Sequence, residues 1–244
     1  MSREGSVTGE ENRLLRSLPA EQYAQLAPHL EPVHLVNGQV LWEAGAVIHS
    51  VYFPRTCVLS MLTPLGDEAP VEAATIGREG VLGTPVVLGT RVTNARALAQ
   101  VPGTAVRIDA ERFVANMRKM NETLFPILLR YAQALQEQTA QSVACNRRHS
   151  LEERCARWLL MTHDRVGSDD FSLTQDFLAF MLGVRRASVT VAAGMLQQAG
   201  LIRYQRGKIE VLDRARLEKA SCECYAVVRR TYDQFLGADA FKVI

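Results

Sequence analysis

The sequence contains no hydrophobic run that could cross a membrane: a spanning helix needs about 18 to 20 apolar residues, and no uncharged stretch approaches that length. Residues 1–15 are polar and acidic and include no apolar signal region. The chain also has no glycine-rich phosphate loop, no nucleophile elbow and no regular series of metal ligands. We therefore expect a cytoplasmic protein that binds no membrane and is not an enzyme.

Cysteine is sparse, and its five positions form neither an even-numbered disulfide framework nor a set of CxxC motifs. Such a set is typical of reduced thiols in a reducing compartment. Cys222 and Cys224 are the only close pair, but side chains two positions apart on a helix point roughly 200° away from each other. We therefore predict no metal site, with a metal or redox role for this pair as the weaker alternative. The histidines show no spacing typical of haem ligands; they are His29, His34, His49, His149 and His163.

Apolar residues make up 48% of the 244 residues, which is enough to fill two hydrophobic cores and suits a chain of two domains. Charge differs modestly along the chain. Residues 1–145 carry 12 Lys and Arg against 14 Asp and Glu, whereas residues 146–235 carry 15 against 11. This asymmetry is too small to indicate a partner by itself.

Short apolar runs recur between residues 30 and 110, separated by turn sequences such as Asn37-Gly38 and Pro102-Gly103. They predict seven short strands, which begin near residues 33, 40, 50, 57, 71, 95 and 104. Strands of this length and spacing are typical of a small barrel, sandwich or jelly roll. The segment Ile76–Gly83 interrupts the series. Its glycines either let backbone amide groups approach an anion or simply make turns, and the second interpretation is at least as well supported.

A long helix is predicted from Asn121, a candidate N-cap, to about Arg148, since no Gly or Pro occurs after Pro126 in this span. A seam near 3.5-residue spacing is typical of a dimer interface, and its apolar members are Leu124, Leu128, Tyr131 and Leu135. Packing of this seam against the chain's own barrel is the alternative, and both can hold at once. A second helix is expected from Leu151 to Asp164.

Residues 172–212 predict a helix, a tight turn, a second helix and a basic hairpin. Ser172 or Thr174 can cap the first helix, and Gly183 lies where the chain must turn sharply. The expected buried side of the second helix consists of Val184, Val189, Ala192, Met195 and Leu196. Its outward side begins with residues that could meet base edges and phosphates, namely Arg185, Arg186, Ser188 and Thr190. An ordinary helical hairpin with solvated arginines is the alternative interpretation.

The hairpin that follows has the character of a wing. After Gly200, two alternating segments, 201–204 and 209–212, flank the basic loop Gln205–Lys208. A glycine in such a loop suits a two-stranded wing that lies along a phosphate backbone. We predict that one face carries the cations of both elements, which are Arg185, Arg186, Arg203, Arg206 and Lys208.

The order of barrel, long helix and winged helix-turn-helix resembles the CRP/FNR family of bacterial transcription regulators over roughly residues 14–235. The most specific part of the resemblance is Leu178-Ala179-x-x-Leu182-Gly183-Val184, together with Val189 and the Arg206-Gly207-Lys208 wing. It implies an α+β fold with an N-terminal jelly-roll-like β-roll similar to cyclic-nucleotide-binding domains. The implied division is a flexible segment 1–13, the roll 14–120, a dimerisation helix 121–148, a winged helix-turn-helix 149–236 and a tail 237–244.

By position, Arg185, Arg186 and Ser188 match the region that reads DNA in such regulators. Ala187 stands where a base-reading Glu is common, and Val191 where a second Arg can occur. We therefore expect a target sequence that differs from those of the best-known members.

The sensor region departs further from the members that bind cyclic nucleotides. Their motif is Gly-Glu-Leu followed downstream by Arg-Ser-Ala, in which the Glu binds the ribose hydroxyl and the Arg binds the cyclic phosphate. Here Thr93 occupies the place of the Arg, and the segment Gly80–Gly83 lacks the Glu. Because a charge-assisted phosphate contact is missing, cyclic AMP binding is not expected. No iron–sulfur cluster is expected either, since Cys57 is the first cysteine and the N-terminal cluster of oxygen-sensing members is absent.

The resemblance still places a candidate effector pocket in the roll and the long helix, for a ligand that the sequence does not identify. Its candidate residues are Glu79, Gly80, Gly83, Arg91, Thr93, Asn94, Gln141 and Ser142. The favoured hypothesis is a homodimeric transcription regulator whose partners are a double-stranded DNA operator, a second copy of the chain and RNA polymerase. The alternative is a cyclic-nucleotide or other small-ligand receptor, whose β-roll binds the effector that switches DNA binding.

Overall fold

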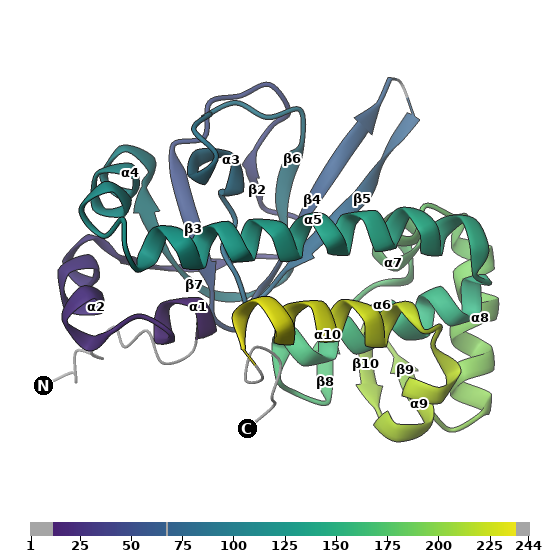
Figure 1. Ribbon diagram of the computed structural model, residues 1–244. Helices are drawn as coiled ribbons and strands as arrows, with labels where there is room; N and C mark the ends of the chain where they lie inside the picture. The colour runs from purple at the N-terminus through teal and green to yellow at the C-terminus, as the bar shows by residue number, and fades with distance from the viewer. Residues whose placement is uncertain (1–11, 67, 238–244) are drawn as a thin grey trace, which may run out of the picture.

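The computed structural model describes residues 12–66 and 68–237 (Figure 1). An N-terminal β-roll is followed by a long helix that runs along it and by a C-terminal head, so the predicted order of domains is confirmed. Most of the predicted flexible segment 1–13 and of the tail 237–244 lies outside the described residues. Asn12 is fully buried, and its amide donates to the carbonyl oxygens of Pro54 at 2.8 Å and Gly80 at 3.0 Å. The chain is therefore already tied to the roll at this residue.

Two antiparallel sheets form the roll. One has the order β1-β7-β3, with β1 at Glu31–Leu35, β7 at Gly103–Asp109 and β3 at Ser50–Pro54. The other has the order β2-β6-β4-β5, with β2 at Val40–Trp42, β6 at Arg96–Val101, β4 at Val58–Leu65 and β5 at Glu68–Ile76. Each predicted strand overlaps one of these seven. Alternation along the strands directs apolar side chains such as Phe53 and Leu59 into a shared core, where they are fully buried.

Short helices accompany the strands of the roll. They are α1 at Arg13–Arg16, α2 at Ala20–Leu26, a 3-10 turn at Ala27–His29, α3 at Thr84–Val87 and α4 at Ala110–Lys119. Asp109 caps α4, because its carboxylate accepts from the backbone N–H groups of Glu111 and Arg112 at 3.0 Å each. Phe113 of α4 then packs edge-on against Phe53 of the roll, with ring centroids 5.9 Å apart.

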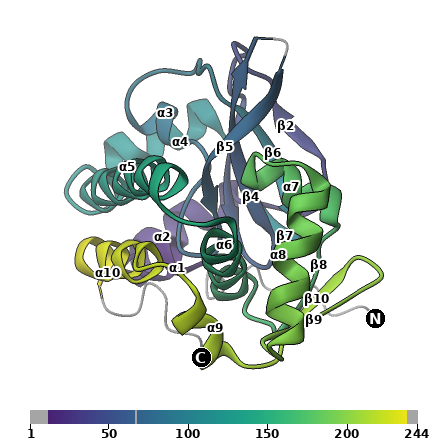
Figure 2. The same cartoon turned by 90° about the vertical axis from the view of Figure 1, so that its right-hand side faces the viewer.

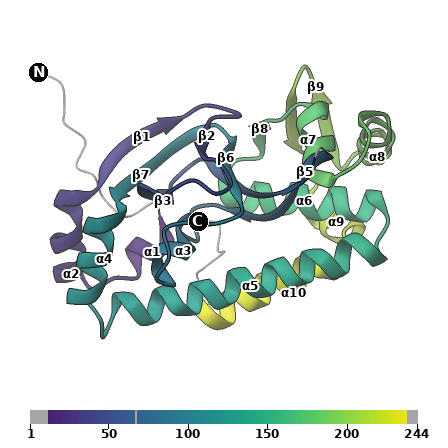
Figure 3. The same ribbon diagram turned by 90° about the horizontal axis from the view of Figure 1, so that it is seen from above.

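The long helix α5 spans Leu124–Arg148, close to its predicted bounds, and begins after Thr123 rather than at Asn121. It forms one edge of the molecule, with the roll on one side and α10 (Cys224–Leu236) packed alongside it (Figure 3). The residues predicted as the dimer seam are buried inside the chain, with exposures of 0% for Leu124, Leu128 and Tyr131 and 6% for Leu135. Tyr131 packs against Tyr232 of α10 at a centroid distance of 6.4 Å. The apolar seam therefore meets the chain's own roll and α10.

The opposite side of α5 is exposed. Its outward residues recur at intervals of four and three and comprise Leu129, Gln133, Gln136, Ala140, Val143 and Arg147. Leu129 is 42% exposed and Val143 is 67% exposed. The residues that could meet a second α5 helix are thus this outward row, and the seam predicted from the sequence is used inside the chain.

The head begins with α6 at Leu151–Val166, which starts with a capping box between Ser150 and Glu153 and ends at Gly167 with φ 70°. The remaining elements are β8 at Asp170–Ser172, α7 at Gln175–Leu182, α8 at Arg186–Gln198, β9 at Ile202–Gln205, β10 at Lys208–Val211, α9 at Arg214–Ala220 and α10 at Cys224–Leu236. The three strands form a small sheet in the order β8-β10-β9. Among the described residues, no single helix is both long and apolar enough to span a membrane.

Candidate nucleic-acid interface

Helices α7 and α8 form a helix-turn-helix. The two are bent by 105° relative to each other, within the range of about 90–120° that is typical of this motif. Thr174 caps α7, since its hydroxyl accepts from the backbone N–H of Phe177 at 3.2 Å. Gly183 ends α7 with φ 65°, a left-handed conformation that glycine adopts without a steric cost. The tight turn predicted at Gly183 is therefore present.

The first turn of α8 is exposed to solvent. Arg185 occupies the N-cap position, and Arg186, Ser188 and Thr190 all lie on the outer side of the helix. The buried side consists of Val189, Ala192, Ala193 and Leu196. Met195 was expected on that side but is 53% exposed. The four buried residues share one side of the helix, and the helical rotation places Met195 away from that side. Figure 2 shows α8 and the β9-β10 hairpin together on the side of the molecule that faces the viewer.

Two polar contacts join the start of α8 to α7. Arg186 pairs with Asp176 at 3.2 Å, and both side chains are more than 60% exposed. The Thr190 hydroxyl lies 2.8 Å from Gln175 Oε1 and 3.1 Å from the carbonyl oxygen of Arg186. An exposed pair such as Arg186–Asp176 contributes about 1 kcal/mol or less, so the guanidinium can leave it for another anion at little cost.

The wing turns more tightly than the sequence suggested. Gln205 pairs with Lys208, so only Arg206 and Gly207 form the loop. Their φ angles are 52° and 75°, and two positive values in a two-residue loop indicate a type I′ turn. Arg206 is the one non-glycine residue with positive φ among those described. The cationic residue Arg206 thus lies at the tip of the hairpin in a backbone conformation that residues with a side chain rarely adopt.

The cations of the wing do not all face the same way. The Tyr204 side chain points toward the segment before α7, since its hydroxyl donates to the Leu173 carbonyl oxygen at 3.0 Å. The backbone N–H of Tyr204 donates to Gln197 Oε1 of α8 at 2.7 Å. Alternation along the strand places Arg203 on the opposite face, where it pairs with Glu210. Lys208, opposite Gln205, lies on that same face. A hollow beside α8 gathers Thr174, Gln175, Asp176, Arg186, Tyr204, Arg206 and Gly207.

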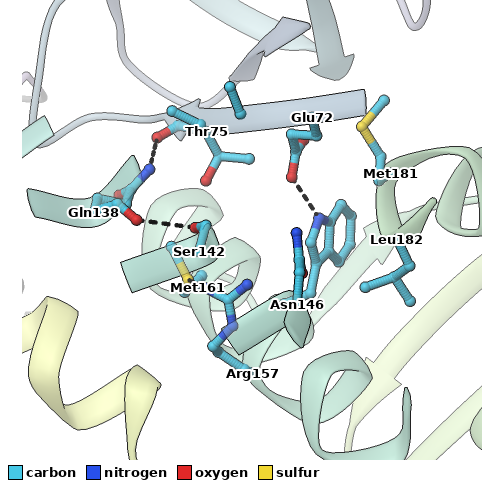
Figure 4. Close-up of a pocket in the computed structure, with 12 residues that line it drawn as sticks. Glu72, Thr75, Gln138, Ser142, Asn146, Arg157, Met161, Met181 and Leu182 are labelled. Atoms are coloured by element: carbon cyan, nitrogen blue, oxygen red, sulfur yellow. Dashed lines mark hydrogen bonds between the residues drawn. The ribbon is translucent and has the colours of Figure 1, made fainter. Parts of the chain in front are cut away.

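The head is held against the roll by polar contacts that the sequence did not reveal. Trp158 of α6 donates its indole N–H to Glu72 Oε1 at 3.0 Å (Figure 4), and Ser60 Oγ lies 2.8 Å from Glu72 Oε2. Burial raises the pKa of the Glu72 carboxyl to about 7, although the hydrogen bonds from Ser60 and Trp158 oppose the shift. Met181 and Leu182 of α7 line the same pocket, so the first helix of the helix-turn-helix packs onto the roll.

A buried ion pair lies behind this pocket. Arg165 Nε of α6 is 2.9 Å from Glu79 Oε1, and the two side chains are 0% and 1% exposed. Further acceptors surround the guanidinium: the Met161 carbonyl oxygen at 3.0 Å and Gln138 Oε1 of α5 at 2.9 Å. Burial is the largest single influence and lowers the pKa of Arg165, but the charge and hydrogen bond of Glu79, together with the charges of Tyr232 and Asp164, outweigh it and raise the pKa. The roll, α5 and the head thus meet at one charged centre.

The glycines of Ile76–Gly83 serve packing at this centre. A Cβ on Gly77 would lie 2.4 Å from Arg165 Cγ, and a Cβ on Gly80 would lie 2.2 Å from the Tyr131 ring. A Cβ on Gly83 would meet Val51 at 2.9 Å. Because the space that an anion would need holds these side chains, the structure favours close packing over an anion-binding loop.

The predicted effector residues are dispersed. Glu79 is engaged with Arg165, and Arg91 pairs with the exposed Glu111 at 2.8 Å. The Thr93 hydroxyl accepts from the backbone N–H of Ala95 at 3.2 Å, and Asn94 is exposed. On α5, Gln141 and Ser142 point to different neighbours: the Gln141 amide donates to Cys224 Sγ at 3.0 Å, and Ser142 donates to the Gln138 carbonyl oxygen at 2.9 Å. The structure does not gather these residues around one space.

The cysteine geometry assumed from the sequence is wrong. Cys222 precedes α10 and Cys224 is its first residue, so the two are not related by helical rotation. Both lie next to Cys145 and His149 at the end of α5, and the ligand atoms of all four residues are within 4.8 Å of one another. The four-residue interval between Cys145 and His149 on a helix was the available signal, but its partners come from 70 or more positions further along the chain.

Comparison with known proteins identifies the head. Residues 153–220 match the family model described as the Crp-like helix-turn-helix domain. The head is a Crp-like helix-turn-helix domain. This match, together with the domain order, confirms the resemblance drawn from the sequence. No curated protein matches the chain.

Solved structures share the fold beyond the Crp-like domain, over 78–79% of this chain. FixK2 from Bradyrhizobium japonicum is 15% identical with a TM-score of 0.67, over 79% of this chain and 98% of its own. A CRP/FNR-family transcriptional regulator from Thermus thermophilus is 16% identical with a TM-score of 0.59, over 78% and 98%. The c-di-GMP responsive regulator CLP of Xanthomonas campestris is 14% identical with a TM-score of 0.55, over 79% and 99%. At these identities the comparison establishes the fold.

Proposed function

We propose that this protein is a homodimeric, sequence-specific DNA-binding transcription regulator. The observation that carries the proposal is the exposed first turn of α8, with Arg185, Arg186 and Ser188, in a helix-turn-helix bent by 105°. The match of this region to the Crp-like domain supports it. A regulator of chromosomal genes would act in the cytoplasm, with RNA polymerase as a further partner.

In this proposal the first turn of α8 enters the major groove. Arg186 and Ser188 reach base edges or phosphates there, because they are exposed and only weakly held by neighbours. Arg206 at the tip of the wing contacts a phosphate of the adjacent backbone, since the turn lifts it clear of the sheet. Arg203 and Lys208, on the other face of the wing, contribute through the general electrostatic attraction of DNA.

We place the dimer interface on the outward row of α5. This row is the exposed side of a 25-residue helix, and it includes the apolar residues Leu129 and Val143. A second copy packed there would place two heads on a symmetric operator without disturbing the buried seam. A single head of this size contacts too little DNA for the affinity of a typical regulator, so a dimer is expected.

The dimer is tested by Leu129→Glu combined with Val143→Glu, which places like charges on both sides of the interface. Light scattering should report a monomer whose operator binding is weakened by at least tenfold. Val36→Glu is a matched control, because Val36 is also exposed, by 56%, but lies outside α5. A dimer that persists in the double variant would contradict this placement.

The function itself is tested by electrophoretic mobility shift with fragments of genomic DNA. The wild-type protein should shift a small subset of fragments at concentrations that leave the rest free. Cyclic AMP should change neither this pattern nor the melting temperature, since Thr93 replaces the phosphate-binding Arg and its hydroxyl is already engaged by Ala95. Equal binding of all fragments would contradict a sequence-specific regulator, and a saturable cyclic AMP effect would favour the ligand-receptor alternative.

A further inference from the structure

The end of α5 and the link between α9 and α10 bring four sulfur and nitrogen side chains together. Cys145 and His149 are one helical turn apart at the C-terminal end of α5, whereas Cys222 lies just before α10 and Cys224 is its first residue. Cys145 Sγ lies 3.5 Å from Cys222 Sγ, and Cys224 Sγ lies 3.5 Å from His149 Nδ1. All four ligand atoms lie within 4.8 Å of one another.

These separations fit one tetrahedral metal ion. Zn–S bonds of about 2.3 Å and Zn–N bonds of about 2.0–2.1 Å, at tetrahedral angles, place sulfur atoms about 3.8 Å apart and sulfur and nitrogen about 3.5 Å apart. The three cysteines are 0%, 4% and 1% exposed and form a cluster separate from the main hydrophobic core. These buried thiols therefore pack against one another rather than into the main core.

The residues around the cluster are those that a metal site needs. His149 Nε2 lies 3.2 Å from a carboxylate oxygen of Glu223, so the imidazole can donate to Glu223 while Nδ1 faces the cysteines. This carboxylate–histidine arrangement fixes the tautomer in many zinc sites. The Gln141 amide donates to Cys224 Sγ at 3.0 Å, which stabilises a thiolate.

We propose that Cys145, His149, Cys222 and Cys224 bind one Zn²⁺ ion. Four protein ligands leave no open position, so the site is structural rather than catalytic. Its place gives it a role in the fold, because His149 is the residue at which α5 ends and Ser150 caps α6. The ion links the junction between α5 and α6 to the start of α10 and thereby fixes the orientation of the head relative to α5.

Elemental analysis of the untagged full-length protein tests the site directly. Protein purified from zinc-supplemented medium and dialysed against metal-free buffer should contain about one zinc per chain and no iron. Cys222→Ser and His149→Ala should each lose at least 80% of it. Cys57→Ala and Cys155→Ala are matched controls, since both cysteines are equally buried but lie outside the cluster, and they should retain the metal.

Cobalt substitution keeps the test valid even if these variants fold poorly. After removal of zinc with a chelator, the wild-type protein should bind one Co²⁺ and develop the strong visible absorption of a tetrahedral thiolate site. His149→Cys should still bind the ion, with a stronger sulfur-to-cobalt charge-transfer band. Three results would each overturn the proposal: zinc below about a tenth per chain with no cobalt uptake, iron in place of zinc, or a Cys145–Cys222 disulfide in protein prepared without oxidant.

Discussion

Charged side chains have opposite surroundings at the two ends of the head. At the junction with the roll, the Arg165–Glu79 pair is completely buried. On the far side, the Arg186–Asp176 pair has nearly the same chemistry but is more than 60% exposed, and Arg185 beside it is exposed as well. The first pair links the head to the roll, whereas the second contributes little to the stability of the fold. We infer that the exposed arginines are present for a ligand outside the chain.

The contrast also separates stability from binding. Removing one partner of a buried pair leaves an uncompensated charge in the interior, which destabilises the fold strongly. Removing one partner of an exposed pair has little effect on folding, because water replaces the lost contact. Variants of the two pairs should therefore affect different measurements.

The largest effect is expected for Glu79→Gln, which leaves the guanidinium of Arg165 without its counter-charge. The free energy of unfolding should fall by about 3–5 kcal/mol in urea denaturation. Glu111→Gln is the matched control: its pair with Arg91 has a similar length, 2.8 Å, but Glu111 is 78% exposed, so the loss should be about 1 kcal/mol or less. Similar losses for the two variants would mean that the junction does not depend on this pair.

A smaller effect, confined to DNA binding, is expected for the arginines of the other end. Arg186→Ala should cost about 1–3 kcal/mol of binding to the cognate site and relax the preference at one base position, with unfolding almost unchanged. Arg206→Ala should weaken binding to all sequences alike and lower the slope of log K against log salt by about one unit. Fluorescence anisotropy at several salt concentrations distinguishes the two patterns. Equal losses on cognate and random DNA for both variants would refute the assignment of α8 to the groove.

A further effect concerns the pH dependence of the junction. The pKa of Glu72 is raised from 4.5 to about 7, so between these values the folded state binds more protons than the unfolded state. The contribution of this group to stability is therefore complete below about pH 4.5 and is lost as the pH rises toward 7. The stability of the wild type relative to Glu72→Gln, which does not titrate, should decrease over this window. A difference that is flat or increases with pH would show that Glu72 is not held in its neutral form.

The head could be predicted from the sequence in some detail because its signals are local. Thr174 as a cap and Gly183 as a turn act within a few residues of the elements that they shape. The wing was predicted with a loop two residues too long, since the left-handed conformation of Arg206 is unusual for a residue with a side chain. Met195 was misplaced because the buried side of α8 depends on what α6 and α7 present to it.

The long-range features could not be read in the same way. Leu128 and Leu135 form an apolar seam, but nothing in the sequence tells whether the roll or a second copy covers it. Gly77 and Gly80 are required by Arg165 and Tyr131, which lie 51 or more positions away. The cysteine cluster likewise forms only when the link before α10 meets the end of α5. In each case the residue can be identified in the sequence, but the distant residue that packs against it cannot.

The central claim is that two copies of the chain present α8 to DNA together, and selection of binding sites from a pool of random duplexes tests it most directly. The enriched sequences should contain two inverted half-sites, with centres separated by about 10–10.5 base pairs or a multiple of that spacing. The Arg186→Ala variant should lose discrimination at the same base in both halves. Enrichment of no sequence, or of a single half-site without symmetry, would contradict the account.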